Sequence, residues 1–414
     1  MREYLSTYFV PILILLQISL SGIVSGTAYG GSVNVADLSP YPRSIEPLDT
    51  NTAAFIGTAP TGPVLKPTLV KSWSGYQAQF GNFDSRHDLS GAVYSYFQNG
   101  GSRVWIVRVG TSPSPLSKPR TVNQSEYLPR VVRAPLPDFA SGLAPLEKID
   151  GISLVAIPGQ TDQQTQTALI RHCEKMLYRF AILDSTSSGG EPGSGSIQEQ
   201  RSKLASAKGY AALYYPWINV QDPVSGAPVL IPPSGAVAGL YARNDRERGV
   251  QSAPVNIAVT GVTSLAAAIS QTEQEALSFS GINVIRFFPG RGYLVWGDKT
   301  LTDNGYWKLI NVRRLSSHIE ESIYRGTQWT VFEPYGEALW ARMSAVVGNF
   351  LNQVWVNGEL RGAKPEEAYF VKCDRTTMTQ SDIDARRLIC LIGIAAVKPR
   401  EFIILRISHQ INQP

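Results

Sequence analysis

The pattern of hydrophobic and polar positions between residues 151 and 220 predicts strands and helices in alternation. Apolar runs at 152–157, 180–183 and 211–220 have the length and composition of strands. Residues 161–177 carry apolar side chains at helical spacing, and the more polar stretch 197–207 also predicts a helix. Strands that alternate with helices are typical of a parallel sheet with crossover helices, so this region predicts a central α/β domain.

The region that precedes this domain shows a shorter version of the same pattern. Strands are predicted at 52–56, 68–70 and 103–109, with a helix at 88–98. The helix is followed by Asn99-Gly100-Gly101, residues that tolerate the left-handed conformation found at helix ends. The run 104–107 is apolar throughout, which is typical of a strand that is buried on both faces.

The stretch from 234 to 297 is predicted to contain a short helix, a charged loop and a hairpin. The helix covers 234–242, and the loop covers 243–249, where six of seven residues carry a charged or amide side chain. The hairpin covers 282–297 and turns at Pro289-Gly290-Arg291-Gly292.

The C-terminal third predicts a smaller α+β domain. Helices are expected at 307–324 and 337–356 because apolar side chains recur there every three or four residues. Strands are expected at 369–371 and 389–397, and Thr379 with Asp382 between them resembles a helix-capping pair.

A last strand is predicted at 402–408, almost at the free end of the chain. Its side chains alternate: Ile403, Leu405 and Ile407 share one face. The other face carries Phe402, Ile404 and Arg406. An edge strand near a chain terminus is suited to pairing with the sheet of another molecule, so these six residues are the candidate inter-subunit contact.

The length of 414 residues agrees with two or three domains. The predicted division is an apolar N-terminal segment at 1–29, an N-terminal region with an extended arm at 30–110, a Pro-rich linker or insertion at 111–150, a central α/β domain at 151–280, a C-terminal domain at 281–400 and a terminal strand arm at 401–414.

Composition favours a globular protein that assembles with copies of itself. The hydrophobic fraction of 43% is ample for a core, and the charged fraction of 17% is low for a freely soluble surface. A net charge of +5 over this length, without a dense Lys/Arg run, argues against nucleic-acid binding.

The N-terminus carries an apolar run at residues 8–24 that has the shape of a signal peptide. Pro11, Gln17 and two serines make it marginal as a membrane span. A docking arm is the alternative interpretation, and membrane contact or secretion through this segment stays open.

Candidate chemistry is sparse. The phosphate-binding GxxxxGK[ST] loop, the GxGxxG fingerprint, HExxH and GxSxG are all missing from the sequence, so no cofactor is predicted. Cys173, Cys373 and Cys390 lie far apart and without a CxxC pair, which favours buried, reduced thiols and disfavours a metal site.

His172 with Asp184 and a serine would be the residues of a hydrolase, but no strained serine elbow or oxyanion hole accompanies them. The sequence therefore predicts a structural protein, with no catalytic residues, and a hydrolase as the alternative.

Two groups of charged residues are more simply explained as ion pairs on a solvated face or an interface than as catalytic groups. They are Arg243, Asp245, Arg246, Glu247 and Arg248, and Arg313, Arg314, Glu320 and Glu321. All nine are candidates for charges that pair between subunits.

Long stretches of the chain resemble contractile tail sheath proteins of phages and related injection systems. The resemblance rests on 281–301, 307–340 and 370–410, and upstream on 210–256, which includes Ile231-Pro232-Pro233-Ser234-Gly235. It continues in Thr52–Gly57 and in Phe97 with Asn99-Gly100-Gly101, and it covers about residues 30–414, most weakly at 110–150.

The resemblance implies a subtilisin-like central domain and a subunit that forms hexameric rings, stacked helically around an inner tail tube. It implies baseplate and tail terminator proteins as further partners, and contraction that drives the tube through a target envelope. It also implies that arms at about 32–45 and 401–410 each add a strand to a neighbouring subunit. The expected location is the cytoplasm, in an assembled phage tail or injection particle. A membrane-tethered relative that uses residues 8–24 is the remaining alternative.

Overall fold

A computed structural model describes residues 44–110, 137–187 and 196–412 of the chain. The predicted apolar segment 8–24, most of the N-terminal arm and residues 111–136 of the predicted linker therefore lie outside the described residues.

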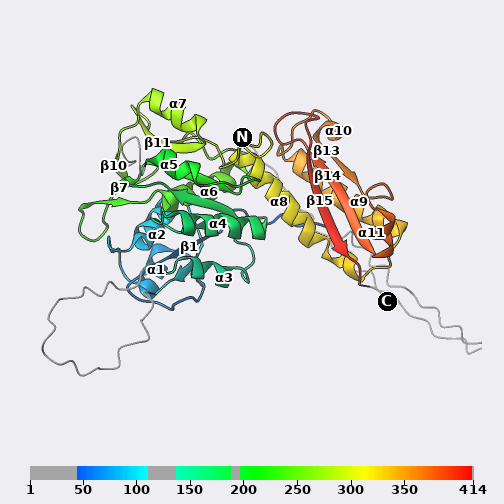
Figure 1. The fold of residues 1–414 in the computed structure, drawn as a ribbon, viewed down its shortest axis with the longest axis horizontal. Coiled ribbons are helices and arrows are strands. Elements are labelled where there is room, and N and C mark those ends of the chain that lie inside the picture. The colour runs from blue at the N-terminus through cyan, green and yellow to red at the C-terminus, as the bar shows by residue number, and fades with distance from the viewer. Residues whose placement is uncertain (1–43, 111–136, 188–195, 413–414) are drawn as a thin grey trace, which may run out of the picture. The chain divides into compact units, whose positions relative to one another are not determined.

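The largest element is a nine-stranded, mostly parallel sheet (Figure 1). Its six central strands run parallel, and the other three pair antiparallel at the two edges. In spatial order the strands are β2 (Thr68–Val70), β3 (Val104–Arg108), β1 (Ala53–Gly57), β4 (Leu154–Ala156), β5 (Phe180–Asp184), β6 (Ala211–Tyr215), β11 (Ile282–Phe288), β12 (Gly292–Trp296) and β9 (Ile257–Ala258).

Helices cover both faces of this sheet, which is why its central strands are apolar throughout. Within β1, Ala53 and Phe55 belong to one core, and Ala54 and Ile56 belong to the other. The first core is closed by α1 (Trp73–Phe80), α2 (Asp88–Gln98) and α6 (Ser234–Arg248). The second is closed by α3 (Leu143–Leu146), α4 (Gln163–Met176), α5 (Ile197–Ser202) and α7 (Gln271–Phe279). The prediction of an α/β region with a parallel sheet is confirmed.

Helices α2 and α6 pack with their backbones in direct contact. A Cβ atom at Gly235 would lie 2.2 Å from the carbonyl oxygen of Ala92, and one at Gly239 would lie 2.4 Å from that of Tyr96. Only glycine permits this approach, so both positions fix how α6 lies on α2.

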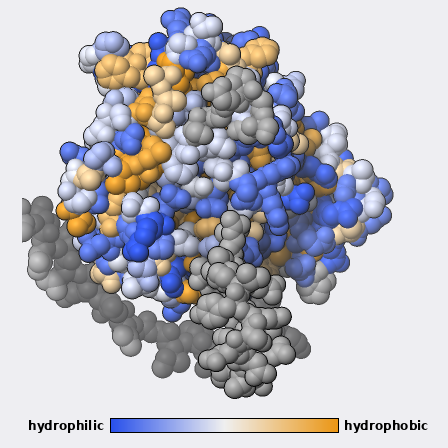
Figure 2. Space-filling view, turned by 60° about the vertical axis from the view of Figure 1, so that its left-hand side comes forward, coloured by the Kyte–Doolittle hydropathy of each residue, from blue (hydrophilic) through white to orange (hydrophobic). Residues whose placement is uncertain are grey.

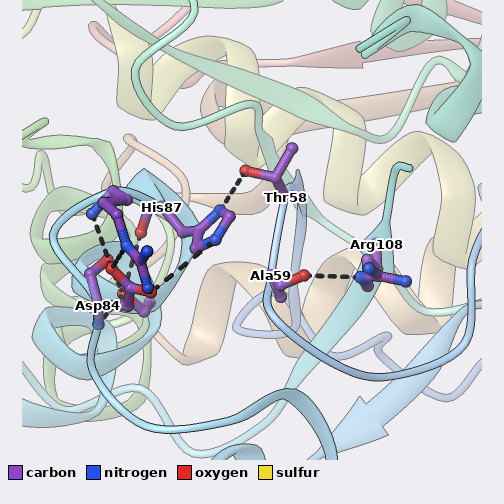
Figure 3. A network of polar contacts seen from close by, with 7 residues as sticks. Thr58, Ala59, Asp84, His87 and Arg108 are labelled. Atoms are coloured by element: carbon purple, nitrogen blue, oxygen red, sulfur yellow. Dashed lines mark hydrogen bonds and ion pairs between the residues drawn. The ribbon is translucent and has the colours of Figure 1, made fainter. Parts of the chain in front are cut away.

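Polar contacts hold the loop that follows β1 against neighbouring elements (Figure 3). Thr58 Oγ1 and His87 Nδ1 are 2.8 Å apart, and Arg108 donates to the carbonyl oxygens of Ala59 and Gly62. Asp84 accepts from Arg86, whose guanidinium lowers the pKa of that carboxyl to about 2. These contacts anchor the segment between β1 and α2.

The C-terminal part has its own core, built on a three-stranded antiparallel sheet in the order β13 (Tyr369–Lys372), β14 (Arg387–Ile394) and β15 (Ile403–Gln410). Helix α8 (Ile310–Gly326) and α9 (Glu337–Val356) pack on it (Figure 1). The short helix α10 (Pro365–Ala368) lies between α9 and β13, α11 (Gln380–Asp384) connects β13 to β14, and the 3-10 helix η2 (Gln328–Phe332) follows α8. A second 3-10 helix, η1 (Ala140–Gly142), precedes α3 in the central part of the chain. The predicted capping pair is present, since Thr379 and Asp382 form a capping box at α11.

Several sequence-based assignments were wrong. The predicted linker 111–150 includes helix α3, whose Leu143 and Leu146 are buried in the second core. The charged stretch 243–249 is not a loop, because α6 continues through Arg248. The predicted strand 211–220 is two strands in different sheets, β6 and β7 (Ile218–Gln221), and β7 pairs with β8 (Pro228–Ile231) and β10 (Val262–Leu265). Helix α1 was missed. The helix predicted at 197–207 ends at Ser202.

Candidate functional site: the terminal strand and the charged junction of helix α8

The candidate site begins with β15, the strand predicted to contact other subunits. It pairs with β14 of the same chain over its full length, from Ile394 opposite Ile403 to Arg387 opposite Gln410. Within the described residues, its other edge has no strand partner. The last strand is thus an edge strand of its own domain, with one open row of backbone hydrogen-bonding groups.

The predicted two-faced character of this strand is confirmed. Ile403, Leu405 and Ile407 are buried in the C-terminal core, while Ile404 is 53% exposed. Phe402 lies just before the strand, and its ring packs against that of Phe370 at 5.2 Å between centroids. Arg406 is exposed.

The end of β15 is fixed to helix α8. His409 Nε2 lies 2.7 Å from Thr327 Oγ1, and the His409 ring stacks on Tyr324. Burial lowers the pKa of His409 to about 4, so this imidazole is neutral near pH 7. Beyond the strand, Asn412 donates its backbone N–H to Val331.

A cleft of about 690 Å³ lies beside the strand. Its walls come from α8, from β15 and from the segment that precedes β5. The lining includes Leu177, Glu320, Tyr324, Arg325, Arg406 and Ile407. Leu177, the last residue of the helix predicted at 161–177 on the strength of its apolar spacing, is instead the left-handed C-terminal cap of α4 and is 45% exposed.

The first half of α8 holds the C-terminal domain to the central sheet through charged residues. Arg314 and Asp245 of α6 form a bidentate ion pair, with N–O distances of 2.8 and 2.5 Å and side-chain exposures of 4% and 1%. Arg314 also donates to the carbonyl oxygen of Thr50 and lies over the ring of Tyr241. Two of the nine candidate charges are therefore brought together inside one chain.

Arg313 is buried in a different environment. Its guanidinium lies 4.1 Å from the centroid of the Trp307 ring and 4.5 Å from that of Tyr210. Glu320 is 3.7 Å away, and burial raises the pKa of that carboxyl. Glu321, one residue further on, pairs with Arg325. These contacts are also within the chain.

Three of the candidate charges remain exposed at the end of α6: Arg246, Glu247 and Arg248. Arg246 donates to the carbonyl oxygen of Gly100, and the half-buried Arg243 donates to that of Ala258. The exposed end of α6 is thus the part of the charged group that is free to meet another molecule.

The residues of the alternative hydrolase do not meet. His172 Nε2 lies 2.8 Å from Arg179, and burial lowers the pKa of that imidazole to about 4. Asp184 instead accepts hydrogen bonds from the Gly159 and Ser234 backbone N–H groups and from the Ser234 hydroxyl. Burial raises the pKa of Asp184 to about 7. The Asp184 side chain thus links the end of β5 to the loop at Gly159 and to the start of α6. This role is structural.

Neither a metal cluster nor a spanning helix is found in the part of the chain that the structure describes. There, no three His, Cys, Asp or Glu side chains gather so as to hold a metal ion. No helix within the same residues, which leave out 8–24, is long and apolar enough to cross a membrane.

The surface carries scattered large apolar side chains. Figure 2 shows hydrophobic patches set among hydrophilic residues on one face. The most exposed large apolar residues of the described chain include Phe279, Phe332, Val224, Tyr306 and Val356. Apolar side chains that are exposed singly in this way are normal for a folded protein and do not by themselves mark an interface.

Comparison with known proteins identifies the class. Residues 138–301 match the model of the phage tail sheath protein central domain, and residues 302–410 match that of the phage tail sheath C-terminal domain. The contracted helical sheath of the anti-feeding prophage is 31% identical, covers 92% of this chain and 98% of that chain, and superposes with a TM-score of 0.71. The contracted sheath of an extracellular contractile injection system is 29% identical over 94% of this chain and 100% of that chain, with a TM-score of 0.70. The fold and the sequence together define a tail sheath protein.

The chain belongs to the phage tail sheath family, which includes the sheaths of extracellular contractile injection systems. The family is structural, which confirms the prediction that this protein is not an enzyme. A crystallised sheath protein of Listeria innocua, 10% identical with a TM-score of 0.62, shares the fold.

Curated relatives match over a shorter region. A prophage major tail sheath protein of Pseudomonas aeruginosa is 25% identical over 43% of this chain, and the tail sheath protein of Enterobacteria phage T4 is 27% identical over 42%. The matched regions span 46% and 26% of those two proteins, so this chain corresponds to less than half of their length.

Proposed function

We propose that this chain is the repeating subunit of a contractile sheath, which polymerises as stacked hexameric rings around an inner tail tube and shortens to drive that tube through a target envelope. The observation that carries this proposal is the 31% identity to a contracted helical sheath over 92% of this chain. Baseplate and terminator proteins are the proposed partners at the two ends of the polymer, and a relative from an anti-feeding prophage baseplate supports the first of these.

The central domain, with helices on both faces of a parallel sheet, is the part that we equate with the subtilisin-like domain of the family. It supplies a rigid body without catalytic residues. Sheath contraction needs rigid subunits that move between two packings, and a sheet with a packed core on each face resists deformation.

The C-terminal sheet is the proposed connector between subunits. The open edge of β15 offers unpaired backbone groups, and the adjacent 690 Å³ cleft leaves room for the side chains of an added strand. Because Ile404 and Phe402 are on the outer face, they are placed to pack against that neighbour. The N-terminal arm is the proposed source of a second exchanged strand. It lies outside the described residues except at its end, where Ile45 packs against Gly326.

A truncation tests the connector. Removing residues 401–414 should abolish tubes in negative-stain microscopy. Normal tubes from the truncated chain would overturn the proposed role of β15. Because Ile403, Leu405 and Ile407 also contribute to the core, loss of solubility has to be checked by sedimentation.

A point variant removes that ambiguity. Ile404→Asp changes an exposed position and leaves the core intact, so the monomer should stay folded while assembly weakens. Val224→Asp is the matched control, because Val224 is 66% exposed and lies outside the C-terminal sheet. Equal assembly of the two variants would count against the connector.

Membrane contact through residues 8–24 is proposed only as an addition to this function. Fractionation of the full chain against a chain without residues 1–28 tests it. Equal recovery of both in the soluble fraction would leave the sheath function intact and remove the membrane contact.

A further inference from the structure

Two of the three cysteines, separated by sixteen residues in sequence, lie opposite each other: Cys390 is in β14, and Cys373 directly follows β13. The last registered pair between β13 and β14 is Lys372 with Leu391, so Cys373 and Cys390 are the next pair along the ladder. Both are buried, and both belong to the core of the C-terminal sheet. Their side chains share the inner face with Val371 and Ile392, which are also paired.

The hydrogen-bond pattern shows which kind of pair this is. Ala395 donates its backbone N–H to the carbonyl oxygen of Ala368 at 2.8 Å, and these two residues lie one position before Tyr369 and Ile394, the first registered pair of the same ladder. Hydrogen-bonded and non-hydrogen-bonded pairs alternate in an antiparallel ladder. Counting from Ala368, Cys373 with Cys390 is a non-hydrogen-bonded pair.

Such pairs bring side chains closest together. Their Cα atoms are about 4.5 Å apart, which lies within the range of about 4.4–6.8 Å found for disulfides. The two thiols are also close enough to interact, because a hydrogen bond with the Cys373 thiol is the largest cause that raises the pKa of Cys390. Cys173 has no such neighbour: it is buried on α4 in the core of the central sheet.

We propose that Cys373 and Cys390 are a modification site, at which a low-molecular-weight disulfide such as oxidised glutathione converts the two thiols into a cross-strand disulfide. A thiolate of one cysteine attacks a sulfur of the small disulfide and releases one molecule of its thiol. The other cysteine then attacks the mixed disulfide and releases the second. Two electrons pass from the cysteines to the small disulfide, and the two cysteine protons end on the two released thiols.

Access to the pair is through β13. This strand has four residues and lies at the edge of the sheet, so its local opening exposes the pair without unfolding the core. Once formed, the disulfide is enclosed by the same core and protected from reductant. It closes the loop that holds α11 and fixes β13 to the central strand β14, at the opposite edge of the sheet from β15.

The test is a count of free thiols in the purified full chain. The chain is incubated with oxidised glutathione, denatured, labelled with N-ethylmaleimide and weighed as intact protein. The count should fall from three to one, and the unreduced digest should contain one peptide pair joined through Cys373 and Cys390. A count that stays at three, a stable glutathione adduct on wild-type Cys373 or Cys390, or a cross-link that includes Cys173 would overturn the proposal.

Variants confirm the assignment. Cys173→Ser should keep the joined peptide pair and show no free thiol after oxidation. In Cys390→Ser the joined pair should be lost. Because the key measurement is made on the wild-type chain, a variant that fails to fold does not weaken the test. Sheath assembly is scored separately, so that failure of the disulfide and failure of the proposed function are distinguishable.

Discussion

Arg314 of α8 and Asp245 of α6 form a nearly inaccessible bidentate ion pair that joins the C-terminal domain to the central sheet. Both charges are removed from water, and each is satisfied mainly by the other. A pair of this kind makes the position of α8 on α6 specific, since any other position would leave a charge buried without its partner.

Removal of one member of this pair should be strongly destabilising. Asp245→Ala leaves the Arg314 guanidinium buried without its carboxylate and should lower the free energy of unfolding by about 3–5 kcal/mol. Chemical denaturation followed by tryptophan fluorescence measures the change. Glu247→Ala, two residues along the same helix but exposed, is the control and should change stability by less than about 0.5 kcal/mol.

The double variant Asp245→Leu/Arg314→Met separates the cost of an unpaired charge from the value of the pair. Because both charges are replaced by apolar groups, it should be more stable than Asp245→Ala alone. If the double variant were less stable than Asp245→Ala, the ion pair itself would stabilise the fold by more than the avoided cost of an unpaired buried charge.

The close approach of α2 and α6 makes a second prediction. Gly239→Ala places a Cβ 2.4 Å from the Tyr96 carbonyl oxygen, so the helices must separate, at a cost of about 1–3 kcal/mol. Gly348→Ala on α9 is the matched control, because nothing lies within 4 Å of its new Cβ. The control should be stabilised by about 0.5–1 kcal/mol, since alanine favours a helix. Thermal unfolding of the two variants should shift in opposite directions, and shifts of equal sign would contradict the packing argument.

Elements with a strong local pattern were predictable from the sequence. The alternation of buried and exposed residues in β15 and the apolar strands β4 and β5 follow directly from side-chain periodicity. Helix α1 had a usable signal that was not recognised. Trp73, Tyr76 and Phe80 recur at spacings of three and four, and Ser72 caps the helix by accepting from Gly75.

The candidate site was harder to predict because its contacts join residues that are distant in sequence. The end of α6 has no apolar stripe, so a periodicity argument ends the helix at Ala242. Asp245 is buried through Arg314, 69 residues away, and no spacing rule connects them. The pairing of Cys373 with Cys390 likewise depends on the register of β13 on β14, which a single sequence does not determine.

The buried imidazole of His318 predicts a loss of stability in acid. Burial lowers the pKa of this side chain to about 4 from 6.5, and its Nδ1 has no hydrogen-bond partner. Arg314 and Asp245 are the charged groups that act on it. Since the folded state favours the neutral ring, its contribution to stability is complete above pH 6.5 and is lost as the pH falls toward 4.

His318→Leu tests this directly. The variant should lose less stability than the wild type between pH 6.5 and pH 4, as measured by the midpoint of denaturant unfolding at each pH. His172 and His409, whose pKa values are also lowered to about 4, should keep part of the acid sensitivity in the variant. Parallel pH profiles of variant and wild type would contradict the role of His318.

Charge reversal at the exposed end of α6 tests the proposed inter-subunit charges. In Arg246→Glu/Arg248→Glu, the monomer should fold normally, because both side chains are exposed and the change costs little. If these arginines meet acidic groups of a neighbouring subunit, the variant should assemble less well, or contract at a different acid or denaturant concentration, because like charges would then face each other. Electron microscopy measures the fraction of sheaths that are extended and the fraction that are contracted. Arg171→Glu/Lys71→Glu, at two exposed positions outside α6, is the control with the same change in net charge. Contraction that is altered equally by the two double variants would assign the effect to net charge, and unaltered contraction in Arg246→Glu/Arg248→Glu would remove Arg246 and Arg248 from the interface.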